Sequence, residues 1–351
     1  MSTVSQGQIA ELKQAIDSND FDFVRALMTG NPALHQAPVG YANNGPLTAV
    51  AECRVPWGPP APVRLAIARW MMENGSDVHQ GGDGPLMRAA LRGERTPMME
   101  LLLAHGADVN ALWNGDFPIL FAACETVEPI SIKWLLKHGA DPNCPQLGKP
   151  VTALDYLIGT YLRSSEFAAC IDLLVTAGGI SRYDLPGVLD TITDRVGPLR
   201  EKLLANPDLI HRRFPELDCG STGARRLLLT GATLLHVAAE FGSVKAAKLL
   251  LDSGTDVNAR ATVDKAGVGG QTPLFHAVTQ FGDRGLRIVR LLLKRGADLS
   301  IRATLPGHYE RPEEIMECNP LEYAERFPGA EFPRANGKTL SLLRKESSTP
   351  S

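Results

Sequence analysis

The sequence lacks the features that would place a chain in or across a membrane. Its 351 residues contain no apolar run of about 18 residues, the length that a membrane-spanning helix requires. The first twenty residues have neither a basic start nor an apolar stretch, so no secretory signal is predicted. The six cysteines are scattered without a CxxC pair, which is typical of reduced intracellular thiols. We therefore expect a soluble, cytoplasmic protein.

The chain also has little net charge and no recognisable catalytic motif. The formal net charge is only −3, without the basic excess that nucleic-acid binding requires. No HExxH, GxSxG, P-loop or dinucleotide-binding motif is present. The histidines outside the recurring elements described below show no i, i+4 pairing with another His or Cys, which argues against a metal site. We expect no catalytic residue, cofactor, metal, nucleic acid or membrane partner.

Aromatic residues make up only 6% of the chain, whereas 44% of it is hydrophobic, which suits a core of small aliphatic side chains between helices. The stretch Gly231–Arg260 (GATLLHVAAEFGSVKAAKLLLDSGTDVNAR) shows how such a core is built. Its apolar residues follow the period of two short helices joined at Gly242-Ser243. Gly254 can close the second helix in the left-handed conformation. A unit this short cannot bury its apolar face alone, so it must stack on neighbours.

Degraded copies of this unit recur along the chain. Each starts with a small or polar residue, often proline, before an aliphatic residue, because proline is tolerated at the first helical position. Each ends in a turn containing glycine, and successive turn glycines lie 31, 33, 39, 76 and 42 residues apart: Gly75, Gly106, Gly139, Gly178, Gly254 and Gly296. The gap of 76 predicts one degenerate unit without such a turn, at 185–212, with two helices of its own. The first helices of the chain, in residues 8–37, are expected to cap the array.

The motifs HGADVNA, HGADPN, TPL and TLLHVAAEFG resemble ankyrin repeats, and the likeness covers roughly residues 8–330. The resemblance implies an all-α solenoid of stacked helix-turn-helix units with projecting β-hairpin or loop fingers. It also implies that His105, His138 and His236 have structural roles, as hydrogen-bonding partners within and between neighbouring units. We expect two sub-arrays, 1–182 and 183–346, in one continuous solenoid, with a C-terminal capping helix and a disordered tail at 347–351.

Insertions interrupt the period on the finger side, at 36–44, 213–231, 261–270 and 301–319. Insertions in a solenoid tend to gather on one face, often the binding face, although surface loops also drift freely in length. The pair Arg225-Arg226 in the second insertion is expected at the surface, either as ordinary surface or as a patch for an acidic partner.

Ankyrin-like stacking further implies a concave face lined by the first helix of each unit. Counting from the aliphatic residue of each helix start, positions two, five and six residues later should face that groove. These positions, with aromatic side chains of the kind that dominate interface energies, are the predicted partner-binding residues: Glu52, Arg88, Arg92, Phe121, Glu125, Tyr156, Glu240, Phe241, His276 and Gln280. For Phe121, Tyr156 and Phe241, packing against neighbouring units is the alternative.

The function predicted from the sequence is that of a non-enzymatic module, expected to be a monomer, which binds a protein partner on the concave face and the fingers. Two alternatives remain: a regulatory or inhibitory subunit of an enzyme complex, and a divergent enzyme with a site near the irregular stretch at 183–230. The enzyme would need a pocket there that gathers several polar side chains.

Overall fold

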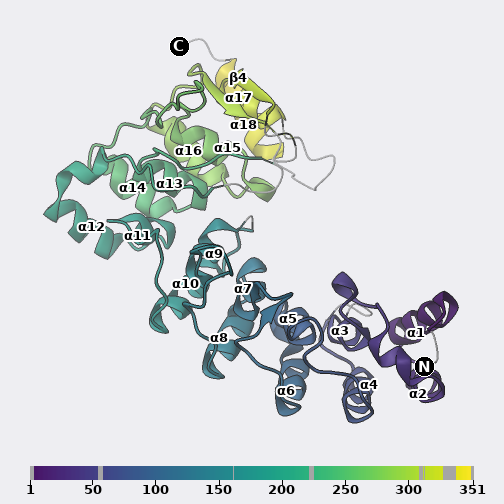
Figure 1. Ribbon diagram of the computed structural model, residues 1–351. Coiled ribbons are helices and arrows are strands. Elements are labelled where there is room, and N and C mark those ends of the chain that lie inside the picture. The colour runs from purple at the N-terminus through teal and green to yellow at the C-terminus, as the bar shows by residue number, and fades with distance from the viewer. Residues whose placement is uncertain are drawn as a thin grey trace. The chain divides into compact units, whose positions relative to one another are not determined.

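The computed structural model consists of paired helices with small hairpins (Figure 1). It describes residues 4–53, 58–160, 162–220, 225–307, 311, 313–326 and 337–348. The chain divides into two compact units, Met1–Leu157 with Ala169–Ser181 and Ile158–Ala168 with Arg182–Ser351. Both units are built from stacked helix pairs, so the predicted fold class is confirmed. The sub-array boundary predicted at 182/183 stays a prediction. Among the described residues, none of the helices is long and apolar enough to cross a bilayer.

In the first unit, the first helices of successive pairs stack on one another, α3 on α5 and α5 on α7, and the second helices α2, α4 and α6 do the same alongside (Figure 1). The elements of this unit are α1 (Gln6–Ser18), α2 (Phe21–Gly30), η1 (Pro32–Gln36), η2 (Tyr41–Asn43), α3 (Pro46–Ala51), α4 (Pro62–Glu73), α5 (Gly84–Ala90), η3 (Gly93–Arg95), α6 (Thr96–Ala104), β1 (Leu112–Trp113), β2 (Phe117–Pro118), α7 (Ile119–Glu125) and α8 (Pro129–Lys137). Helices α9 (Ala153–Gly159) and α10 (Phe167–Thr176) contribute residues to both units.

The second unit repeats this arrangement, with α11 on α13 and α13 on α15 in one row and α12, α14 and α16 in the other. Its elements are α11 (Val188–Ile192), α12 (Val196–Ala205), η4 (Pro207–Ile210), α13 (Leu234–Phe241), α14 (Val244–Asp252), α15 (Pro273–Val278), η5 (Phe281–Asp283), α16 (Leu286–Lys294), β3 (Ala303–Pro306), β4 (Ile315–Cys318), α17 (Pro320–Arg326) and α18 (Gly337–Ser347). Helices α11 and α12 form the degenerate pair predicted at 185–212. Ser347 still belongs to α18, so the predicted tail does not start there, and 349–351 lie outside the described residues.

Asparagines in the exit turns join neighbouring repeats by a recurring pair of hydrogen bonds. Asn110 Nδ2 donates to the Gly139 carbonyl oxygen at 2.9 Å, and its Oδ1 accepts the Asp141 amide at 2.8 Å. Asn258 bonds in the same way to the carbonyl of Gly296 and the amide of Asp298. Gly139 and Gly296 have φ of +92° and +86°, a conformation that costs glycine little. These side-chain to backbone hydrogen bonds therefore help to hold successive exit turns at a regular spacing.

The histidines of the recurring motifs also make structural hydrogen bonds. His236 Nδ1 accepts the Thr233 amide at 3.1 Å, while Nε2 lies 3.0 Å from the Gln271 carbonyl oxygen of the next pair. His105 and His138 bond through Nδ1 to carbonyl oxygens one helical turn earlier. These contacts tie helix starts and ends to their surroundings, as the family resemblance implied.

The core of Gly231–Arg260 is closely packed, because residues 231–240 are all buried and Leu250 has no exposed surface. Leu250→Ala is therefore expected to reduce the free energy of unfolding by about 2–5 kcal/mol, from lost transfer energy and the cavity left behind. Urea denaturation followed by circular dichroism measures this, with Lys248→Ala on the exposed face of α14 as the control. A change below about 0.5 kcal/mol, the range of ordinary surface substitutions, would show that Leu250 does not support the core.

The predicted fingers differ in how far they project. Residues 301–319 include the antiparallel pair β3–β4, in the register Ala303↔Cys318 and Leu305↔Met316. In the segment 213–231, Leu227 instead packs in a buried cluster with Phe275 of α15, Leu305 of β3 and Tyr323 of α17. Arg225, expected at the surface, is fully buried. This expectation was wrong because sequence spacing does not show what an inserted segment packs against.

Candidate partner-binding surfaces

Five aromatic side chains form a continuous series in the first unit, which we call the aromatic row: Tyr41, Trp113, Phe117, Phe121 and Tyr156. The ring centroids of Tyr41 and Trp113 are 5.5 Å apart, and Trp113 meets Phe117 edge-on at 5.9 Å. Phe117 contacts Phe121 at 5.7 Å and Tyr156 at 5.5 Å, and the last two rings stack at 4.7 Å. Only Phe121 is fully buried, whereas Tyr41 is 44% exposed. The other three are half-buried, so the row presents ring surface to solvent.

The aromatic row is assembled by turns as well as helices. Tyr41 lies in η2, and Trp113 and Phe117 face each other across the β1–β2 pair. The loop of this hairpin contains Asn114 and Gly115 with φ of +51° and +84°, values that these two residue types adopt more readily than others. Phe121 and Tyr156 come from the neighbouring helices α7 and α9. Two predicted residues, Phe121 and Tyr156, are thus joined to three that the sequence reasoning missed.

An ion pair borders the Tyr41 end of the aromatic row. Arg88 Nε lies 2.8 Å from Glu52 Oε1, and both side chains are largely buried. The Arg88 guanidinium carbon also lies 4.3 Å from the centre of the Tyr41 ring, within the range of a cation–π contact. Glu52 and Arg88 were both predicted, and the structure brings them together. Glu52 is only 4% exposed, so its role is to hold Arg88 rather than to face solvent, which corrects the expected exposure.

In the second unit, four of the predicted residues lie close together, but three of them are buried. Glu240 and His276 have no exposed surface and Gln280 has 5%, with its amide bonded to the His276 carbonyl at 2.8 Å. Phe241 is half-buried and contacts Arg163, whose guanidinium carbon lies 4.4 Å from the ring centre. The expectation that Glu240, His276 and Gln280 face an open groove was wrong. Fully buried Phe121 in the first unit requires the same correction.

Glu240 is the centre of a buried charged cluster. Its Oε2 accepts from Arg225 Nη2 at 2.7 Å and from His276 Nδ1 at 2.8 Å, while Arg163 Nη2 lies 3.8 Å from Oε1. Burial alone would raise the pKa of Glu240, but Arg225, His276 and Arg163 hold that pKa below its usual range. Burial lowers the pKa of His276 despite its bond to Glu240. The cluster therefore consists of an ionised Glu240, a neutral His276 and two arginines.

The remaining predicted residues lie at helix ends. Arg92 follows α5 and is exposed, and its Nη1 is 3.9 Å from Glu128 Oε1. Glu125 is half-buried at the end of α7. The role of Arg92 and Glu125 in binding stays a prediction.

The irregular stretch at 183–230 contains a cavity of about 410 Å³, but its lining is mostly apolar, with Leu185, Pro186 and Leu209. Its Lys202 is paired with Asp190 at 2.5 Å. Within the described residues, no three His, Cys, Asp or Glu side chains are grouped in a way that could hold a metal ion. The lining also includes Asp184 and Asn206, and the enzyme alternative stays a prediction.

Stacked helix pairs, exit turns with glycine, and asparagine hydrogen bonds between successive repeats define a helical repeat protein. A family model for ankyrin repeats, described as "Ankyrin repeats (3 copies)", matches residues 63–146 and 203–303, which together are more than half of the chain. The protein belongs to the ankyrin repeat family, whose repeats are generally protein–protein interaction modules. No match was found among curated proteins.

Proposed function

We propose that the protein is a non-enzymatic module that binds a protein partner through the aromatic row and the adjacent Arg88. The observation that carries this proposal is the continuous, partly exposed series of rings that ends at the Glu52–Arg88 pair. Aromatic residues and arginine are enriched at interfaces and account for most of their binding energy. A surface of this composition supports recognition of another protein better than it supports chemistry.

The packing of the row favours binding because its side chains are already held in place. Each ring contacts at least one other ring, and Arg88 is fixed between Glu52 and Tyr41. Little side-chain entropy would then be lost when a partner covers the exposed ring surface. The row also joins a finger residue, a hairpin and two helices, so fingers and first helices would act together. Arg92, Glu125 and half-buried Phe241 remain proposed contributors at other positions.

The test compares two exposed aromatic residues of the same unit. Tyr41 is 44% exposed in the row, and Phe23 is 43% exposed on α2, outside it. We expect Tyr41→Ala, alone and with Trp113→Ala, to weaken partner binding by about 2 kcal/mol or more, roughly 30-fold. Phe23→Ala should leave binding unchanged.

Affinity capture with mass spectrometry identifies partners of the wild type, and calorimetry with the purified partner then measures each variant. Circular dichroism confirms that each variant is folded. A partner that binds Tyr41→Ala and the double variant as tightly as it binds Phe23→Ala would contradict the proposal.

A further inference from the structure

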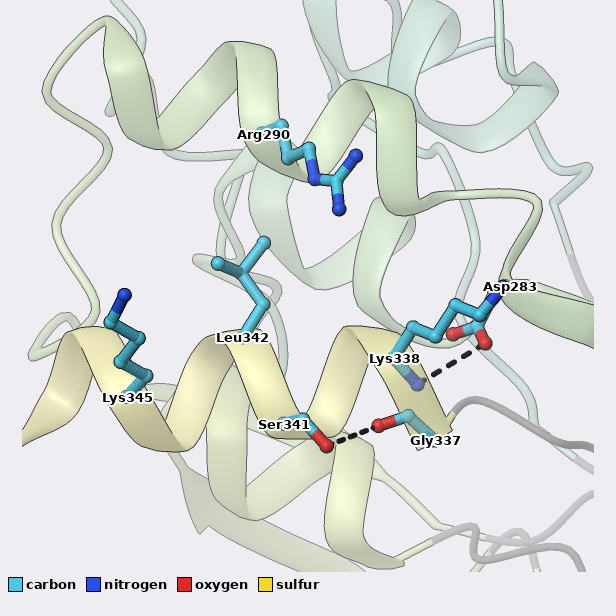
Figure 2. Close-up of a pocket in the computed structure, with 7 residues that line it drawn as sticks. All are labelled: Asp283, Arg290, Gly337, Lys338, Ser341, Leu342 and Lys345. Carbon is cyan, nitrogen blue, oxygen red and sulfur yellow. Dashed lines mark hydrogen bonds between the residues drawn. The ribbon is translucent and has the colours of Figure 1, made fainter.

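A pocket in the second unit lies between α16 and α18, with a volume of about 630 Å³ (Figure 2). Arg290 enters it from α16, and Lys338, Leu342 and Lys345 enter it from α18 (Figure 2). Three cationic side chains therefore surround an apolar one. This combination matches no feature of the aromatic row, so the pocket is a distinct surface.

The one carboxylate in the pocket lining already has backbone partners. Asp283 accepts the amides of Lys338 and Thr339 at 3.2 Å and 2.9 Å, and so caps the start of α18. In Figure 2 its carboxylate lies at the start of this helix, away from Lys345 at the other end. With three cations and one carboxylate, the lining has a net charge of +2.

Several arginines of the second unit have a carboxylate at ion-pair distance: Arg295 with Asp252, Arg302 with Glu322, Arg311 and Arg326 with Glu314, and Arg344 with Glu325. Among the described residues, neither Arg290 nor the Lys338 ammonium has a carboxylate within 4.0 Å, although both side chains are exposed. The charges of Arg290 and Lys338 are therefore available to a ligand.

The positive charge also continues along α16. Arg287, Arg290 and Lys294 are exposed and lie at i, i+3 and i+7, so they share one face of the helix. Leu342 is half-buried among the polar lining residues and offers a small apolar contact. A ligand that suits this surface carries several negative charges and at least one apolar group.

We propose that this pocket binds an acidic peptide segment of a partner protein, with its carboxylates at Arg290 and Lys338 and an apolar side chain on Leu342. Charge complementarity of this kind brings specificity and a fast association rate. A peptide meets the requirement better than a free anion, because an anion would leave Leu342 uncovered.

The test uses a fluorescein-labelled peptide with the central sequence Glu-Glu-Leu-Glu-Glu and fluorescence anisotropy at low ionic strength. We expect the double variant Arg290→Glu/Lys338→Glu to bind it roughly tenfold or more weakly than the wild type, because charged hydrogen bonds are lost and like charges introduced. The control variant Lys245→Glu/Lys248→Glu on α14 has the same net charge change outside the pocket. It should bind as the wild type does.

Two companion probes complete this test. A peptide with Gln in place of each Glu should bind at least tenfold more weakly, and one with Ser in place of Leu should also lose affinity. Equal weakening in the pocket and control variants would overturn the proposal in favour of nonspecific attraction. The same proteins are also tested with phosphatidylserine vesicles. If the vesicles displace the peptide from the wild type and bind the Arg290→Glu/Lys338→Glu variant more weakly, the pocket recognises a membrane surface and the peptide proposal is overturned. The Tyr41→Ala/Trp113→Ala variant should bind the peptide normally, so failure here is separable from failure of the proposed function.

Discussion

Replacing Glu240 with alanine is expected to destabilise the second unit by about 3–5 kcal/mol, because removal of one partner leaves a buried charge uncompensated. Arg225 is fully buried, and Glu240 is its carboxylate partner at 2.7 Å. The other Arg225 contacts are the carbonyls of Gly220 and Leu227, which cannot neutralise a guanidinium. The variant should therefore also release Arg225 and the residues that follow it from α13.

The two units can be followed separately in this experiment. All four tryptophans precede residue 157 and belong to the first unit, so tryptophan fluorescence reports on that unit alone. Hydrogen exchange of α13 and of residues 225–232, with mass spectrometry, reports on the second. We expect faster exchange in the second unit and an unchanged fluorescence transition. Glu201→Ala removes an exposed carboxylate on α12 and should change stability by less than about 0.5 kcal/mol.

A second variant distinguishes charge from packing. Arg225→Met/Glu240→Leu removes the closest charged pair, keeps apolar bulk and leaves Arg163 without its carboxylate neighbour. Replacements of buried ion pairs by apolar residues are often neutral. We expect the double variant to be clearly more stable than Glu240→Ala. If Glu240→Ala alone loses less than about 1 kcal/mol, the buried pair does not hold the segment in place.

Acidification is expected to unfold the second unit, and His236 is one of the titrating groups responsible. Burial, with nearby His276 and Arg213 as smaller effects, lowers the pKa of His236 to about 3, from 6.5 in the unfolded chain. Its Nδ1 accepts the Thr233 amide, so protonation there would set two donors against each other. Because the unfolded state binds the proton more tightly, stability is full above pH 6.5 and falls as the pH approaches 3. The loss between pH 7 and pH 4 is roughly 3 kcal/mol, at about 1.4 kcal/mol per pKa unit.

Urea denaturation followed by far-ultraviolet circular dichroism at a series of pH values measures this dependence. His236→Gln removes the titrating group, so it should flatten the dependence between pH 7 and pH 4 while lowering stability at pH 7. His276 and Glu240, both buried with lowered pKa values, would contribute to the remainder. Exposed His211 serves as the control, and His211→Gln should keep the wild-type profile. A profile unchanged by His236→Gln would contradict this assignment.

The sequence alone determined the repeat architecture, because its determinants act over short distances. The proline before each helix, the left-handed glycine after it and the asparagine of the exit turn each work within one unit or with the next. Gly254 illustrates this, since its predicted left-handed conformation is found at φ +94°. Even the degenerate pair α11–α12 followed from the 76-residue gap and the apolar pattern of its two short segments.

Only the tertiary structure decided which of the predicted residues are exposed. Helical spacing put Glu240 and His276 on the same face of their helices, and their side chains meet at 2.8 Å. It could not show that Arg225, in an inserted segment, is buried against Glu240, because that contact depends on residues outside the repeat period. For the same reason Tyr41, Trp113 and Phe117 were missed: they come from turns and strands, and only packing brings them to Phe121 and Tyr156. The repeats are determined by short-range sequence features. The exposed surfaces depend on how the insertions between repeats pack on the helices.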